Sequence, residues 1–163
     1  MRVALPVGLF STGYTIHDHA DGPVLAEITM PGLTKPGQIR VGAVPYTFKS
    51  TDWLGRRTVL QFEGVEVGVV TRPSLWTSAL VVSFAPGFSG DLGPFRVVRQ
   101  GVFTTGYRVE HEAHGGHVGD IERPSSFRRE TWIDLPDAVP FLAQAFLAAI
   151  VLLAIQRAQS GAA

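Results

Sequence analysis

The chain contains no cysteine, so neither a disulfide framework nor a zinc site with thiolate ligands can stabilise it. This composition suits a reducing compartment, and we expect a cytoplasmic protein that is either soluble or associated with a membrane. A length of 163 residues is enough for one domain with a real hydrophobic core, and a second full domain would not fit. We therefore treat residues 1–163 as a single domain.

The chain also lacks an excess of charge of either sign. Its 14 Lys and Arg residues balance its 14 Asp and Glu residues, which leaves no formal net charge. A neutral chain creates no global field that would attract nucleic acid, and we expect no nucleic-acid partner. Any binding driven by charge must come from a local cluster.

Catalytic and cofactor-binding motifs are missing as well. There is no cysteine nucleophile, no serine in a G-x-S-x-G elbow, and no glycine-rich loop that follows a strand and opens a helix to hold phosphates. Ser89 lies in a loop between Pro86 and Pro94, and nothing in the spacing brings it to a histidine and an aspartate. We predict a non-enzymatic protein without a cofactor, with a hydrolytic enzyme as an alternative.

Short runs rich in Val, Ile, Thr, Tyr and Phe fill about residues 9–133, separated by Gly, Pro and Asp. Residues 1–14 are interpreted as a first strand instead of a signal peptide, because Pro6 and Gly8 interrupt their apolar stretch. So many short strands favour a closed antiparallel barrel, since a flat open sheet of that size would curl or split. The eleven candidate strands are 13–18, 24–29, 38–44, 46–50, 58–62, 65–71, 77–84, 95–100, 106–112, 117–122 and 128–133.

The C-terminal region is the one long apolar segment. Residues 138–155 contain a single polar side chain, that of Gln144. Asp137 can cap a first helical turn, and Pro140 falls within that turn, where its missing N–H is harmless. We predict a hydrophobic helix at about residues 138–157, roughly 30 Å long at the usual rise per residue.

This predicted helix has no polar face, so it belongs either inside the protein or inside a bilayer. Its length suits both places. Gln144 and the many alanines favour the protein interior, as does the lack of Trp or Tyr at the helix ends, because interfacial belts favour those residues. A small β domain anchored by a C-terminal transmembrane helix is the alternative.

The sequence contains an internal repeat. Residues 12–31 align without a gap on residues 105–124, with seven of the twenty positions identical. A partial third copy is the segment GVVTRPS at 68–74, which matches GDIERPS at 119–125. Each copy holds a strand, a polar turn, a strand and a stop at proline or just before it. The repeat predicts a β-hairpin that is used several times around a common interior.

Three segments, 13–28, 107–121 and 127–137, carry a family resemblance that covers nearly the whole chain. Repeated hairpins followed by an apolar helix resemble the tubby-like barrel superfamily, which includes tubby C-terminal domains, LURP-one-related proteins and phospholipid scramblases. The resemblance implies a closed barrel that encloses its final helix, with twelve strands where we count eleven. It also implies a binding domain, since tubby-like domains bind phosphoinositide headgroups through basic residues and scramblases act on membranes.

Histidines gather in two turns of the repeat, with His17 and His19 in the first and His111, His114 and His117 in the other. Imidazoles beside carboxylates can bind a metal ion, so a metal-dependent enzyme is a further alternative. Both groups occupy the polar turn of the repeated hairpin, where solvated side chains are expected. We therefore predict no metal site.

Two arginine pairs, Arg56 with Arg57 and Arg128 with Arg129, are the candidate binding residues. Guanidinium groups near an aromatic ring suit the headgroup of an anionic lipid. Ion pairs with neighbouring acids such as Asp52 are the alternative use of these residues. We predict a binding or scaffold domain whose partner is an anionic lipid, a membrane surface or another protein.

Overall fold

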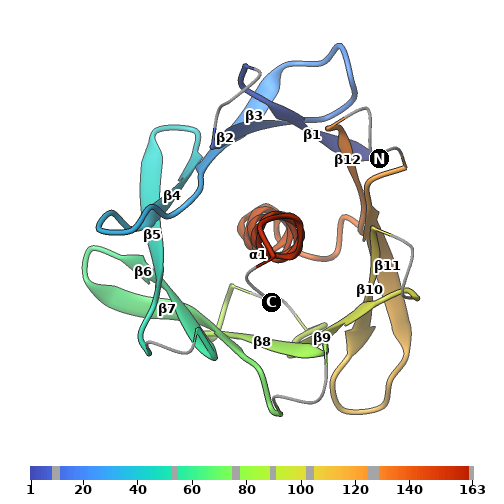
Figure 1. Cartoon of the computed structure of the whole chain (residues 1–163). Coiled ribbons are helices and arrows are strands. Elements are labelled where there is room, and N and C mark those ends of the chain that lie inside the picture. Colours follow the sequence, from blue (N-terminus) through green and yellow to red (C-terminus); the bar gives the residue numbers. More distant parts are fainter. Residues whose placement is uncertain are drawn as a thin grey trace.

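The computed structural model of the chain describes residues 1–8, 12–52, 55–74, 78–88, 91–101, 105–124 and 129–161. Twelve antiparallel strands close into a barrel, and one C-terminal helix, α1 (Phe141–Gln159), follows them (Figure 1). The expected all-β class, closed antiparallel barrel and C-terminal helix are thus confirmed. The strands are β1 (Arg2–Pro6), β2 (Gly13–His17), β3 (Val24–Thr29), β4 (Gly37–Val41), β5 (Val44–Ser50), β6 (Arg57–Phe62), β7 (Val65–Thr71), β8 (Leu80–Phe84), β9 (Phe95–Arg99), β10 (Gly106–His111), β11 (His117–Glu122) and β12 (Thr131–Asp134).

The first strand, β1, corrects the count of eleven strands and the expected start of the barrel near residue 9. It pairs with both β2 and β12 and thereby closes the ring. Its residues Val3 and Ala4 are fully buried, although the segment is short and ends at Pro6. Proline is tolerated there because it lies at the strand end, where little pairing is lost. The interpretation of the N-terminal segment as a strand holds for Arg2–Pro6, whereas residues 13–14 belong to β2, and the count omitted β1.

The three repeated segments lie in hairpins that share an irregularity in the register of their strands. In β2–β3, β6–β7 and β10–β11, the pairing shifts directly after Ile16, Leu60 and Val109, respectively. These residues face Ala26, Gly68 and Gly119, so each hairpin has its irregularity at the same place. The hairpins follow one another at intervals of four strands around the ring of twelve, which gives the barrel an approximate threefold repeat.

Because neighbouring strands run in opposite directions, the barrel has two different rims. At the first rim, β12 leads into α1, and the turns β2–β3, β4–β5, β6–β7, β8–β9 and β10–β11 lie around that point. At the second rim α1 ends, and the connections β1–β2, β3–β4, β5–β6, β7–β8, β9–β10 and β11–β12 surround it. The two rims therefore share no connection.

The helix α1 begins three residues later than the sequence predicts. Pro140 is its N-cap residue, with φ of −54° and ψ of 142°, and no side chain caps the helix there. A residue before proline is disfavoured in the helical region, which holds Val139 out of the helix. Asp137 does not cap the first turn as expected, and its carboxylate instead lies 3.3 Å from Arg2.

The side chains of α1 pack on those that point into the barrel, and Figure 1 shows the helix at the centre of the ring of strands. Phe146 makes edge contacts with Phe48 of β5 and Phe84 of β8, with ring centroids 6.4 and 5.8 Å apart. A barrel of this many strands is too wide to be filled by its own side chains. The buried residues of α1 are Ala143, Gln144, Ala145, Phe146, Leu147, Ala148, Ala149, Ile150, Val151, Leu152, Leu153 and Ile155.

Gln144 is only 2% exposed and links α1 to the first strand. Its Oε1 accepts a hydrogen bond of 2.7 Å from Arg2 Nη1. Its Nε2 donates to the carbonyl oxygens of Val139 and Pro136, at 2.9 and 3.2 Å. The one polar side chain of the apolar segment is therefore fully engaged, and it holds the start of α1 against β1.

Replacing Gln144 with Leu should destabilise the fold by about 1–3 kcal/mol, because Arg2 and two carbonyl groups would lose their partner. Urea denaturation followed by circular dichroism measures this loss. Leu153→Met in the same helix is the control, and it should cost less than about 1.5 kcal/mol because volume is conserved. A Q144L variant as stable as the native chain would show that these hydrogen bonds do not hold the helix.

Gly119 has no room for a side chain. An added Cβ would overlap the carbonyl oxygen of Asp134 and lie 2.8 Å from Leu135 Cδ2. We expect Gly119→Ala to destabilise the fold by about 2 kcal/mol or more, because backbone would have to move. Gly32→Ala is the control, since nothing lies within 4 Å of its Cβ position. Thermal unfolding of both variants tests this, and equal melting temperatures would contradict it.

Candidate functional site

The two rims carry opposite charge, although the chain as a whole is neutral. The connections at the first rim contain acidic residues but no Lys or Arg, and those acids are Asp18, Asp21, Glu63, Asp91, Glu112 and Asp137. The second rim has Asp52 and Glu130 as its only connection acids in the sequence. Its described basic residues are Lys35, Arg56, Arg72, Arg123, Arg129 and, at the end of α1, Arg157. Charge is therefore separated along the barrel axis.

The first predicted pair of arginines is held by acidic partners. Arg56 Nε lies 3.3 Å from Asp52, and Arg57 binds Glu66 through two contacts of 2.9 and 3.1 Å. Desolvation works to raise the pKa of Asp52, but hydrogen bonds from Arg57 N–H and from Arg56 outweigh it and lower that pKa. The ion pair expected with Asp52 is thus formed. Of these two arginines, only Arg56 belongs to a connection of the second rim, because Arg57 begins β6.

The second predicted pair lies elsewhere on the same rim. Arg128 falls outside the described residues, and Arg129 is half-buried in the connection before β12. In the strand order, the β11–β12 connection is across the ring from the β5–β6 connection that carries Arg56. The structure therefore does not bring Arg56 and Arg129 together into one site.

Two arginines that the sequence analysis did not select occupy equivalent places in the repeat. The backbone N–H groups of Met30, Arg72 and Arg123 donate to the carbonyls of Thr12, Arg56 and Thr105, each time one step beyond the last strand pair. The signal for them was present in the sequence as the segment Arg-Pro-Ser, which follows both β7 and β11. The first copy has Met30-Pro31 at the same position, with Met30 buried in the interior cluster.

Arg157 places a guanidinium group inside the second rim, whereas Arg72 is exposed. Its Nη1 lies 3.5 Å from the Cβ position of Gly55, in the connection whose next residue binds the backbone of Arg72. Burial, followed by the charge of Arg72, lowers the pKa of Arg157. The negative end of the α1 dipole favours a cation at this position. Arg157 and Arg72 repel each other, so a bound anion would be favourable at this rim.

The histidines take part in local structure. His17 Nδ1 hydrogen bonds the carbonyl of Gly22 at 2.7 Å, His111 Nδ1 does the same with the carbonyl of Leu92 at 2.9 Å, and His117 Nε2 contacts Asp120 at 2.8 Å. The rings of His111 and His114 lie 4.4 Å apart. His19 is exposed in its turn. Within the described parts of the chain, no three His, Asp or Glu side chains are placed to hold a metal ion.

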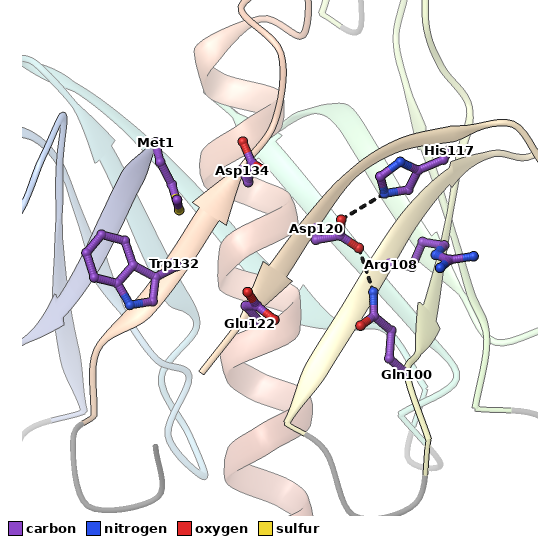
Figure 2. A pocket seen from close by; sticks show the side chains of 8 residues that line it. All are labelled: Met1, Gln100, Arg108, His117, Asp120, Glu122, Trp132 and Asp134. Carbon is purple, nitrogen blue, oxygen red and sulfur yellow. Dashed lines mark hydrogen bonds and ion pairs between the residues drawn. The ribbon is translucent and has the colours of Figure 1, made fainter. Parts of the chain in front are cut away.

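A groove of about 320 Å³ lies on the outer wall of the barrel, over β9 to β12 (Figure 2). Three carboxylates line it, and Asp120 and Asp134 face each other directly across β11 and β12. Asp120 is already bound by His117 and by Gln100 Nε2 at 2.5 Å. Such a wall suits a cationic group better than an anionic one. The lining residues are Met1, Gln100, Arg108, His117, Asp120, Glu122, Trp132 and Asp134.

Ser89, the serine of the hydrolase alternative, lies outside the described residues. No family model, curated protein or solved structure matches the chain. The resemblance to tubby-like barrels and the absence of catalysis therefore stay predictions.

Tyr107 is a buried phenol near the second rim whose pKa is shifted by its surroundings. It is 6% exposed and faces Arg99 across β9 and β10. Burial raises the pKa of Tyr107, and the charges of Arg99 and Arg72 offset only part of that effect. The folded state therefore favours the neutral phenol. This contribution to stability is present below the unfolded pKa of about 10 and is lost as pH rises through the folded value.

We accordingly expect the free energy of unfolding to fall less between pH 8 and pH 11 in the Tyr107→Phe variant than in the native chain. Urea unfolding midpoints at both pH values measure the difference. Tyr46→Phe is the control, because it removes a phenol from another part of the barrel. If the Y107F variant loses as much stability as the native chain over this interval, the phenol of Tyr107 is not the group that limits stability in alkali.

Proposed function

We propose that this chain is a non-enzymatic binding module of tubby-like type, with α1 as the permanent core of its barrel and an anionic lipid surface as its partner. The second rim would face that surface. The observation that carries this proposal is the separation of charge between the rims, with arginines around the end of α1 and acids around its start.

The burial of α1 supports its role as a core. The helix is long and apolar enough to cross a bilayer, yet 72% of its apolar stretch is buried among the strands. Removing it would expose Phe48, Phe95 and Leu60, which are fully buried against it. Each such side chain stabilises the fold by roughly 1.5–3 kcal/mol through its burial. The barrel therefore loses its filling if the helix leaves for a membrane.

Electrostatics favours the second rim as the contact surface. A Lys or Arg near an anionic membrane contributes about 1 kcal/mol, and the effect fades within about 8–10 Å at ordinary salt. Because acids occupy the opposite rim, they lie beyond that range when the second rim faces the lipid. The charge separation would thus orient the barrel as well as attract it.

Apolar side chains around the second rim would add to this attraction. Leu33 is fully exposed in the β3–β4 connection, two residues before Lys35. The stretches of sequence that link the other strands of this rim contain Phe10, Trp53, Trp76, Phe103 and Phe127, which lie outside the described residues. Aromatic residues are favoured at membrane interfaces, so this composition agrees with a lipid partner.

A membrane anchor is the second candidate function, and the hydropathy of α1 is the observation that favours it. The two proposals predict different conditions for extracting the protein from a membrane. A peripheral module is released by high salt or by carbonate at high pH, whereas a spanning helix resists both and requires detergent. Expression of the full chain without detergent, followed by these extractions, separates the two.

Sedimentation with vesicles tests the lipid proposal. We expect the protein to bind phosphatidylcholine vesicles that contain phosphatidylserine, more weakly as salt rises, and not to bind pure phosphatidylcholine. Lys35→Glu with Arg56→Glu should weaken binding about tenfold or more, given about 1 kcal/mol per basic residue.

The control changes the same charge elsewhere. Arg40→Glu with Arg96→Glu alters two exposed arginines on the barrel wall toward the first rim and leaves the same net charge. This variant should retain most of its binding. Equal weakening in both double variants would contradict a specific role of the second rim. No binding to anionic vesicles at low salt would refute the lipid partner and leave a protein partner.

A further inference from the structure

Arg123 and Thr131 are neighbours inside the barrel wall at the second rim. In the pairing of β11 with β12, Ile121 faces Ile133 and Glu122 faces Trp132, so one further step of this register places Arg123 opposite Thr131. The two isoleucines belong to the interior cluster, and side chains two residues along a strand share a face. Arg123 and Thr131 therefore point inward, and their exposures are 5% and 0%.

Both side chains hold a buried polar atom without a partner. Arg123 Nε and Thr131 Oγ1 have no hydrogen-bond partner within the protein, although the backbone of Arg123 is engaged by Thr105. A buried donor left unpaired is costly, and a buried unpaired charge costs more. Such groups in a folded protein call for an explanation, and a bound ion is one of the recognised explanations.

Neutralisation by a carboxylate does not explain Arg123. Within the described residues, no Asp or Glu lies within 4 Å of it. The adjacent Glu122 lines the groove on the outer wall, on the other side of the sheet (Figure 2). At the first rim the situation differs, since the inward Arg2 lies within 4.0 Å of both Asp18 and Asp137.

Structural need does not explain Arg123 either. The equivalent residue of the first hairpin is Met30, which is buried in the interior cluster and makes the same backbone hydrogen bond. An apolar side chain thus satisfies the fold at this position. Arginine stands instead at two of the three copies, where Arg72 is exposed and Arg123 is buried.

We propose that Arg123 and Thr131 form a buried binding site for an oxyanion of the phosphate type. Arg123 Nε and Thr131 Oγ1 are its donors, since guanidinium and hydroxyl groups both bind phosphate oxygens well. The phosphate comes either from inorganic phosphate or from the headgroup of a lipid. This site is inferred from buried side chains alone, so it does not depend on the membrane contact proposed above.

Titration of the full chain with inorganic phosphate tests the site, with chloride at matched ionic strength as the reference. We expect phosphate to raise the melting temperature and to give saturable heats in calorimetry. Arg123→Met restores the residue type of the first hairpin and should fold, but its affinity for phosphate should fall about tenfold or more, as for the loss of a charge-assisted hydrogen bond.

Thr131→Val keeps the shape of the side chain and removes the hydroxyl. It should be at least as stable as the native chain without phosphate, because an unpaired buried hydroxyl is gone, and it should gain less stability from phosphate. Arg57→Gln is the control, because Arg57 binds Glu66 on the outer wall. The stabilisation of this variant by phosphate should equal that of the native chain. An unchanged phosphate response in both R123M and T131V would refute the site, as would a native response no larger than that to chloride.

A second comparison identifies the source of the phosphate. If glycerophosphoserine binds at least tenfold more tightly than inorganic phosphate, and this gain is lost in R123M, the site is assigned to a lipid headgroup. Equal or weaker binding assigns it to free phosphate. Phosphate binding without vesicle binding would support the site and refute only the membrane contact. Vesicle binding without any response to phosphate or to the soluble headgroup would refute the site alone.

Discussion

The interior of a ring of twelve strands is wider than its own side chains can fill, and the whole structure depends on how that space is occupied. In Figure 1 one helix of 19 residues lies at the centre of the ring. Residues on all sides of α1 are buried, which fits its lack of a polar face. The alanines of the helix are buried as well, while Phe48 and Phe84 of the strands pack on its Phe146.

The helix also makes the two rims unlike each other. Where α1 begins, its first turn is tied to the wall through Arg2 and Gln144, and the surrounding turns are acidic. Where it ends, Arg157 lies beside Gly55, and two of the three equivalent positions of the repeat hold arginine. The approximate threefold repeat is thus broken in chemistry but not in backbone. We infer that the shared backbone pattern maintains the fold, whereas the side chains that differ between the copies are available for binding.

Much of the architecture could be predicted from the sequence, because alternation of buried and exposed residues, turn residues and an apolar helix are local signals. β1 was left out of the count because it is short and ends at Pro6, and its strand character comes from distant partners in β2 and β12. The helix start was misplaced because Pro140 was assigned to the first turn. The site was harder to predict, since no local pattern shows that Arg123 turns inward while Glu122 turns outward.

The closing pair of strands has a consequence for synthesis of the chain on the ribosome. β1 precedes the other eleven strands in the chain, yet β12, its second neighbour, comes after all of them, and α1 follows β12. Until then the nascent sheet keeps two open edges and an unfilled apolar face, both of which favour aggregation. Barrel closure therefore has to wait until β12 has been synthesised and can pair with β1.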